Sequence, residues 1–366
     1  MDRRAFLLGC SAAASPFMTP VALADGPWDN RLIVIILRGA MDGLDVIRPV
    51  FDPLYAGLRP TLSGGGLPVG DWALHPALAP LLPLWQEGEF GAVHAVSTPY
   101  RDKRSHFDGQ DILEAGGDRD DGWLNRMIGL TPGMAAEVAY AVGRERMLVM
   151  DGAAPVSRWS PDVRLRVSPQ AERLIQLVHE GDALFEAASE DALRIAGQVD
   201  RLSGGPEHTR LAEFVVQRMR AQTRIASFSI GGWDTHGGQA RGIARALGRL
   251  SEIVLSLRDG LGPVWGQTGV LCLTEFGRTA RENGTGGTDH GTGGAALYFG
   301  GALNGGRVLG NWPGLADLYA GRDLMPVRDV RSYAGWALRG LFGSSVSDLE
   351  GTVFPGAEMG SDPGIV

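Results

Sequence analysis

The sequence predicts an α/β fold with a mostly parallel central sheet and helices on both of its faces. The first observation is the run R-L-I-V-I-I-L at residues 31–37, which is apolar at successive positions, as in a strand buried on both faces. The second is that such runs alternate with helical segments along the chain. The third is that glycine-rich polar segments follow two later apolar runs, where ligands bind in α/β sheets.

The remaining elements follow from periodicity and from helix-stopping residues. The helix at 105–116 ends at a Gly-Gly pair, and the helical pattern over 168–222 is interrupted by S-G-G-P at 203–206. No linker divides the chain after residue 24, so we expect residues 25–366 to form one domain with a helical insertion at about 160–222. Further strands are predicted at residues 90–96, 136–142, 147–150, 224–230 and 269–274, and further helices at 74–87 and 239–259.

Residues 1–24 are typical of a twin-arginine export signal. Arg3 and Arg4 precede a short apolar stretch, and V-A-L-A places Ala22 and Ala24 at a cleavage site before Asp25. A buried first helix is the alternative, but the run is short and rich in alanine and serine. L-L-G-C, which ends at Cys10, lies too close to the arginines to be a lipoprotein signal. The sequence thus predicts a periplasmic or secreted protein that is exported folded, with the twin-arginine export machinery as a partner.

Charge and cysteine content exclude several classes of function. The chain carries a net charge of −8, and residues 1–24 contribute +1 (two arginines, one aspartate), so the remainder carries −9. Such an acidic chain is a poor partner for nucleic acid or anionic lipid. No segment after the signal approaches a membrane span, so we expect no stable membrane insertion. Removal of the signal leaves Cys272 alone, which excludes an internal disulfide.

Two polar segments combine carboxylates with imidazoles. G-G-W-D-T-H-G-G at 231–238 contains Asp234 and His236. The stretch at 273–294 contains T-E-F-G-R and T-D-H-G, which supply Glu275, Arg278, Asp289 and His290. Carboxylate and imidazole together are ligands of divalent metals, so we expect one or two ions (Zn, Mn, Mg or Ca). Alternatively, Glu275 and Arg278 form an ion pair. The isolated histidines are expected to be structural or solvated: His75, His94, His179 and His208.

Several blocks resemble a widespread family of exported bacterial proteins, domain of unknown function 1501. They are R-G-A-M-D-G-L-D, H-P-A-L-A-P-L, Y-R-D-K-R-S-H-F-D-G-Q-D, G-G-W-D-T-H-G-G, T-E-F-G-R-T-A-R-E-N-G and T-D-H-G-T-G-G, which follow in the family's order within residues 38–312. That family is similar to the alkaline phosphatase and sulfatase superfamily. The resemblance implies a single alkaline-phosphatase-like domain with metal at the carboxyl edge of a parallel sheet.

The resemblance also implies roles for residues in the first half of the chain. Asp42 matches the aspartate that follows the superfamily's first strand and binds metal, and Asp45 is the second choice for that position. The alternative role for these aspartates is an Asx turn or a helix cap. Ser105 matches the nucleophile at the start of a helix, and an ordinary N-cap is its alternative. His106 is a candidate ligand or proton donor. The basic residues before Ser105 are candidate anion anchors: Arg101, Lys103 and Arg104.

The second half departs from the superfamily pattern. Asp234 and His236 are spaced D-x-H where the superfamily usually has D-x-x-x-H, although both side chains can still reach one ion. Glu275 and Phe276 stand where the superfamily has Asp-His, so one metal position is either depleted or filled by His106. His290 matches a late histidine ligand, and Asp289 is either a ligand or a partner that orients an imidazole.

These observations predict an exported metal-dependent hydrolase that acts on small anionic phosphate or sulfate esters. The catalytic candidates are Ser105, His106, Arg104 and Arg278, and the metal candidates are Asp42, Asp234, His236, Glu275, Asp289 and His290. The alternative is a metal-stabilised binding or accessory protein without turnover. A scaffold without metal is disfavoured, because it would not explain why the polar residues cluster.

Overall fold

The computed structural model describes residues 27–101, 105–161 and 205–366. The predicted export signal, Lys103, Arg104, His179 and most of the expected helical insertion lie outside this part of the chain. The predicted sheet and its flanking helices lie almost entirely inside it.

Within the described residues, the core of the fold is a nine-stranded mixed sheet. Strand β10 pairs antiparallel with both of its neighbours, whereas the other strand pairs are parallel, so the prediction of a mostly parallel sheet is confirmed. In spatial order the strands are β11 (Val308–Leu309), β5 (Phe90–Ser97), β10 (Gly294–Phe299), β9 (Thr268–Leu273), β1 (Arg31–Leu37), β8 (Ile225–Ile230), β6 (Ala139–Val142) and β7 (Ser157–Trp159), with β12 (Arg328–Asp329) also paired to β5.

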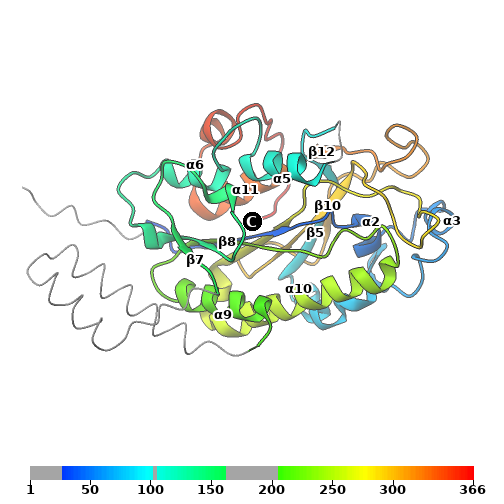
Figure 1. Cartoon of the computed structure of the whole chain (residues 1–366), viewed down its shortest axis with the longest axis horizontal. Helices are drawn as coiled ribbons and strands as arrows, with labels where there is room; N and C mark the ends of the chain where they lie inside the picture. Colours follow the sequence, from blue (N-terminus) through cyan, green and yellow to red (C-terminus); the bar gives the residue numbers. More distant parts are fainter. Residues whose placement is uncertain (1–26, 102–104, 162–204) are drawn as a thin grey trace, which may run out of the picture.

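Helices cover both faces of this sheet, as the apolar β1 predicts. Alternate β1 residues enter two separate cores: Ile33 and Ile35 pack on one face, and Leu32 and Val34 pack on the other. The first face is covered by α9 (Glu207–Met219) and α10 (Gln239–Leu261). The second is covered by α5 (His106–Ala115), α6 (Trp123–Gly129) and α11 (Val330–Phe342), and Figure 1 shows the two groups of helices on opposite sides of the strands.

Shorter elements complete the described chain, and none of its helices is long and apolar enough to cross a membrane. A small antiparallel sheet has the order β2 (Ile47–Arg48), β4 (Trp72–Leu74), β3 (Leu67–Val69). The short helices are α2 (Gly43–Val46), α3 (Tyr55–Leu58), α4 (Leu82–Gln86) and α12 (Val346–Asp348). Short segments of 3₁₀ or π type cover Pro76–Leu81, Ala136–Val138, Leu148–Met150, Gly262–Gln267 and Leu349–Val353.

Three predicted elements differ from the observed ones. The expected helix at 74–87 is a 3₁₀ segment, Pro76–Leu81, followed by the short α4. The expected strand at 147–150 is wrong, because Leu148–Met150 is a 3₁₀ turn closed by the Met150 amide on the Met147 carbonyl (3.0 Å). Its apolar side chains are buried without being part of the sheet, and periodicity cannot distinguish such a short run from a strand. The expected strand at 136–142 begins later, at Ala139, after a 3₁₀ turn.

The fold brings polar loops to one edge of the central sheet. Strands β1, β8 and β9 run parallel, so the loops after Leu37, Ile230 and Leu273 all leave from their common carboxyl edge. Because β10 is antiparallel to β9, the segment that precedes Gly294 reaches the same edge. The candidate residues from segments far apart in sequence therefore meet there.

Candidate metal centre

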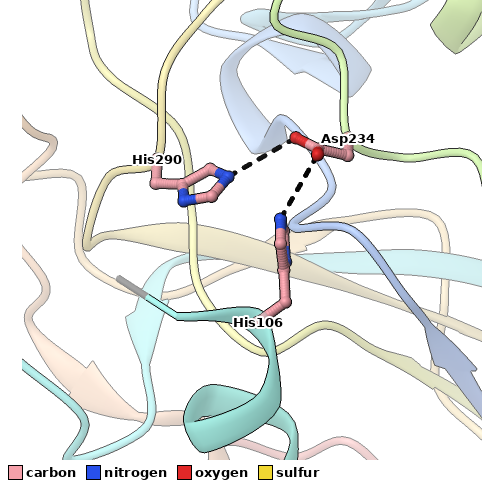
Figure 2. Close-up of side chains that lie close together, drawn as sticks. All are labelled: His106, Asp234 and His290. Carbon is pink, nitrogen blue, oxygen red and sulfur yellow. Dashed lines mark ion pairs between the residues drawn. The ribbon is translucent and has the colours of Figure 1, made fainter. Parts of the chain in front are cut away.

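Three loops at the carboxyl edge bring an aspartate and several histidines together. Asp234 and His236 follow β8, His290 precedes β10, and His106 is the first residue of α5. Among the described residues, His106, Asp234 and His290 offer ligand atoms that all lie within 4.8 Å of one another. Figure 2 shows both imidazoles turned toward the Asp234 carboxylate.

The distances between these atoms are those of ligands around a single ion. Asp234 Oδ2 lies 3.4 Å from His106 Nε2, and Asp234 Oδ1 lies 3.4 Å from His290 Nε2. His236 extends the group, because its Nε2 lies 2.9 Å from His290 Nε2 and 3.1 Å from Asp234 Oδ1. Ligands about 2.0–2.2 Å from zinc stand roughly 3–3.5 Å apart. His106, Asp234 and His290 therefore fit one divalent ion, and His236 lies in contact with two of them.

Carboxylates orient two of the imidazoles through their other ring nitrogen. His106 Nδ1 lies 2.7 Å from Glu275 Oε1, and His236 Nδ1 lies 3.0 Å from Asp289 Oδ1. An ionised carboxylate only accepts hydrogen bonds, so Nδ1 is the donor and neutral Nε2 presents a lone pair to the site. His106 Nε2 is buried and makes no hydrogen bond with the described residues. Metal-ligating histidines have this carboxylate-supported arrangement.

The acidic residues of the site are held in their ionised form. Burial alone raises the pKa of Asp234, but the hydrogen bond and charge of Arg278 outweigh it, and the net pKa is below its usual value. Burial likewise raises the pKa of Glu275, and hydrogen bonds from His106, Gln110 and the Gly39 amide reverse that effect. The hydrogen bond from His236 lowers the pKa of Asp289. The hydrogen bond to Glu275 in turn raises the pKa of His106. The group is therefore built to attract a cation.

Arg278 holds the loops of the site together. Its side chain is buried, and Nη2 donates to Asp234 Oδ1 (2.5 Å) and to the Gly39 carbonyl (2.6 Å). Nε donates to the Ala40 carbonyl (2.9 Å), and Nη1 donates to the Thr288 carbonyl (3.0 Å). The guanidinium thus joins the loops after β1, β8 and β9. Catalysis by Arg278 stays a prediction. Its carboxylate partner is Asp234, and not the Glu275 of the alternative ion pair.

The close contact between the β1 and β8 loops depends on a glycine. Gly39 has φ +120°, and a Cβ there would lie 2.5 Å from the Asp234 backbone nitrogen. A residue with a side chain would therefore push the Asp234 loop away. The Gly39 amide also donates to Glu275 Oε1 at 2.9 Å, which holds the carboxylate beneath His106.

Asp42 and Asp45 belong to a buried ionic network instead of the metal group. Asp42 Oδ2 lies 2.6 Å from Arg59 Nη1 and accepts from Gln239 Nε2 (2.7 Å), while Oδ1 caps α2. Burial raises the pKa of Asp42, and the adjacent Arg59 guanidinium brings the net pKa below its ordinary value. Asp45 pairs with Arg48 at 2.7 Å. The structure thus gives Asp42 the helix-capping role that was its alternative, and its prediction as a metal ligand is not supported.

Ser105 is the N-cap of α5. Its hydroxyl accepts from the Asp108 amide (3.4 Å), and its own amide donates to the Tyr100 hydroxyl (2.7 Å). Capping is therefore established by geometry, while nucleophilic attack by Ser105 stays a prediction. Phe276, which stands where a superfamily histidine was expected, stacks on the His106 ring with centroids 5.2 Å apart.

Two residues of the site were missed in the sequence. Gln110 Nε2 donates to Glu275 Oε1 (3.0 Å), and Asn283 Nδ2 donates to Asp289 Oδ1 (3.1 Å). Gln110 lies four residues after His106, which places both on the same face of α5, so helical spacing could have identified it. Asn283 carried no such signal, because its position depends on how the glycine-rich loop folds.

The fold and site define an α/β protein with a candidate mononuclear metal centre at the carboxyl edge of its sheet. The chain belongs to the family described as Protein of unknown function (DUF1501), which matches residues 103–332, and the predicted family membership is confirmed. No curated protein matches the sequence.

Solved structures match over much of the chain with low sequence identity. One is a protein in the alkaline phosphatase superfamily from Vibrio parahaemolyticus (12% identity, TM-score 0.34, covering 82% of this chain and 69% of that one). Another is the C-terminal periplasmic domain of EcEptC from Escherichia coli in complex with Zn (8%, 0.38, 75% and 74%). A third is the lipoteichoic acid synthase LtaP from Listeria monocytogenes (9%, 0.33, 70% and 58%).

Proposed function

We propose that this protein is a metal-dependent hydrolase of phosphate or sulfate esters. The observation that carries the proposal is the convergence of His106, Asp234 and His290 on one point, next to His236. Carboxylates support two of the imidazoles, those of His106 and His236. The Asp234 and His236 side chains are each 46% exposed, so a small ester can approach the group from solvent.

The residues divide into those that would hold an ion and those that orient them. His106, His236, His290 and Asp234 would hold one divalent cation, and three imidazoles favour zinc or a similar transition metal over Mg²⁺ or Ca²⁺. Such an ion supplies Lewis acidity toward the charged oxygens of an ester. Glu275 and Asp289 fix the tautomers of His106 and His236, and Arg278 fixes the Asp234 carboxylate. The attacking oxygen is either the Ser105 hydroxyl or water.

Ester turnover by wild type, Ser105→Ala and His236→Ala tests this proposal and identifies the attacking group. With metal supplied, wild type should hydrolyse at least one of phosphate monoesters, phosphate diesters and sulfate esters. If Ser105 attacks, Ser105→Ala should reduce the rate by more than about a hundredfold without loss of metal. Ser345→Ala is the matched control, because Ser345 also caps a helix, with its hydroxyl accepting from the Asp348 amide at 3.0 Å. It should lose about 1 kcal/mol of stability at most and no activity.

Each result of this experiment has a definite meaning. Equal non-zero rates in wild type and Ser105→Ala would leave water as the attacking group. Full activity of metal-free His236→Ala would contradict a metal-dependent reaction. No turnover by wild type on any ester class, with metal bound, would favour the alternative of a non-catalytic binding or accessory protein.

We also propose that the protein is exported through the twin-arginine route and acts in the periplasm or outside the cell. The support is the pattern of residues 1–24, with Arg3 and Arg4 before an apolar stretch and Ala22 and Ala24 before Asp25. Replacing both arginines with lysine should retain the precursor in the cytoplasm. N-terminal sequencing of the exported wild type should begin at Asp25, and an exported species that still begins at Met1 would contradict cleavage.

A further inference from the structure

A cavity lies at the carboxyl edge of the sheet, beside the loop that carries Asp234. It has a volume of about 520 Å³, which is within the range of small-molecule sites. Its walls come from the segment after β6, the end of β8, the start of α9 and the outer face of α10. Gly231 and Gly232 line it, so the cavity and the candidate metal centre share one loop.

The charged groups that line this cavity are two arginines and two glutamates, Arg144, Arg249, Glu145 and Glu207, beside His208. Arg144 lies 3.6 Å from Glu207, and Glu145 pairs with Arg38 at 2.7 Å and accepts from the Ser229 hydroxyl at 2.9 Å. Elsewhere on the wall, Arg249 Nη2 donates to the Gly231 carbonyl at 2.8 Å, and His208 pairs with Glu252 at 2.7 Å.

This balance selects the chemical class of the ligand. An anion in the cavity would face the carboxylates of Glu145 and Glu207, and a cation would face the guanidiniums of Arg144 and Arg249. A neutral ligand with many hydroxyl groups meets neither repulsion. Hydroxyls both donate and accept, so they can bond guanidinium, carboxylate and serine groups at once.

Glycine keeps the cavity open. An added Cβ on Gly231 would meet no atom within 4 Å, and the same is true of Gly143 on the opposite wall. Gly231 has no positive φ, so a side chain can be placed there without backbone strain. Gly231 therefore offers a way to fill the cavity while leaving the fold intact.

We infer that this cavity binds the neutral, polyhydroxylated part of the substrate, as in a sugar or cyclitol ester. The inference rests on the proposed function, since the charged ester group of the same molecule would lie at the metal centre. It adds a substrate class, a phosphorylated or sulfated polyol, that the metal centre by itself does not specify.

The test is direct binding of uncharged polyols to the metal-loaded protein, measured by saturation-transfer NMR and calorimetry. The probes are glucose, galactose and myo-inositol, with inorganic phosphate and ethanolamine as charged comparisons. Wild type should bind at least one polyol, and Gly231→Phe should weaken that binding by at least about tenfold. Gly129→Phe is the matched control, because Gly129 also has open space around it and no positive φ but lies at the end of α6, away from the cavity.

The cavity and the metal centre can fail separately in this experiment. His236→Ala should keep polyol binding and lose phosphate binding, whereas Gly231→Phe should do the reverse. If Gly231→Phe does not fold, Arg249→Gln takes its place, because it removes a charge from the same wall. It should likewise weaken polyol binding and keep phosphate binding. The inference would be overturned if wild type bound no polyol, or if the cavity variants bound polyols as tightly as wild type does. It would also be overturned if wild type preferred phosphate or ethanolamine and the cavity variants lost that preference.

Discussion

At the scale of single residues, the partners of the two ring nitrogens decide what a histidine does. His94 uses both for the backbone: its Nδ1 accepts from the Ala95 amide at 2.9 Å, and its Nε2 lies 3.1 Å from the Ile47 carbonyl. The ring is buried and stacks on Trp72 with centroids 5.1 Å apart. His106 and His236 instead place Nδ1 against a supporting carboxylate and turn Nε2 toward the other residues of the site. His94 is therefore structural, as the sequence predicted.

The environment of His94 predicts a loss of stability at mildly acid pH. Burial lowers the pKa of His94 to about 4, so the folded protein resists protonation that the unfolded chain accepts near pH 6.5. The contribution of His94 is fully present above about pH 6.5 and is lost as the pH falls toward 4. Linkage puts the whole loss at about 3 kcal/mol. Chemical unfolding with chelator present, so that metal release does not contribute, measures it.

The matched variant for this effect is His94→Asn. It should be less stable than wild type at pH 7. Between pH 6.5 and 4, however, its free energy of unfolding should fall by less than that of wild type. Burial also lowers the pKa of His75, so part of the slope should remain. An unchanged slope in His94→Asn would show that another group carries the pH dependence.

At the residue scale, the sequence could predict which side chains meet on loops, but not the partners of side chains that are buried. Asp234, His236 and His290 follow or precede strands in glycine loops, and that local pattern was enough. Asp42 and Arg278 have equally suggestive positions, but their partners come from distant segments: Arg59 in one case, and the Gly39 and Trp233 carbonyls in the other. No local pattern contains those contacts.

At the scale of elements, the site depends on how closely the loops after β1 and β8 approach each other. Gly39 permits the approach, and Gly39→Ala should therefore displace Asp234. The expected result is a metal affinity about 10- to 100-fold weaker, in addition to a stability loss of about 1–2 kcal/mol from the left-handed backbone. Titration with metal and thermal unfolding measure the two effects.

Gly70→Ala separates backbone strain from the collision. Gly70 has φ +64°, and an added Cβ there would meet no atom within 4 Å. It should lose stability from strain alone and bind metal as wild type does. Weakened metal binding in both variants, or in neither, would contradict the role assigned to Gly39.

Strands with long apolar runs were predictable, whereas β10 and the two-residue strands were not. The strands around β1 carry continuous apolar stretches, so their existence and buried position follow from the sequence. Strand β10 was missed because G-G-A-A-L-Y-F continues a glycine-rich loop, and its antiparallel direction is set by pairing with β5 and β9. Strands β11 and β12 contain two residues each, too few for any periodicity.

At the scale of the whole molecule, the candidate ion would join segments separated by more than a hundred residues. His106 opens a helix on one face of the sheet, whereas Asp234 and His236 lie just before α10 on the other face. His290 belongs to the loop that enters β10. The sequence predicted which residues gather at the sheet edge. Only the three-dimensional arrangement distinguishes the candidate ligands from the carboxylates that support them.

Because the ligands come from distant segments, metal binding should stabilise the whole fold. An ion that binds only the folded protein adds about 2.7 kcal/mol at a free concentration one hundred times its Kd. Thermal unfolding of wild type should therefore shift upward as Zn²⁺ is added and downward with chelator, and elemental analysis should find one ion per chain. The His236→Ala, His290→Ala double variant should lose both the bound ion and the metal-dependent shift, because two of the four ligands are gone.

The control for the double variant is His208→Ala, which removes an imidazole outside the metal group that pairs with Glu252. It should retain one ion per chain and the full metal-dependent shift. An ion retained by the double variant in the amount found in wild type would place the metal elsewhere in the chain. A wild type that binds one ion yet unfolds at the same temperature with and without it would mean that the unfolded chain binds the ion equally well, which would contradict a centre assembled by the fold.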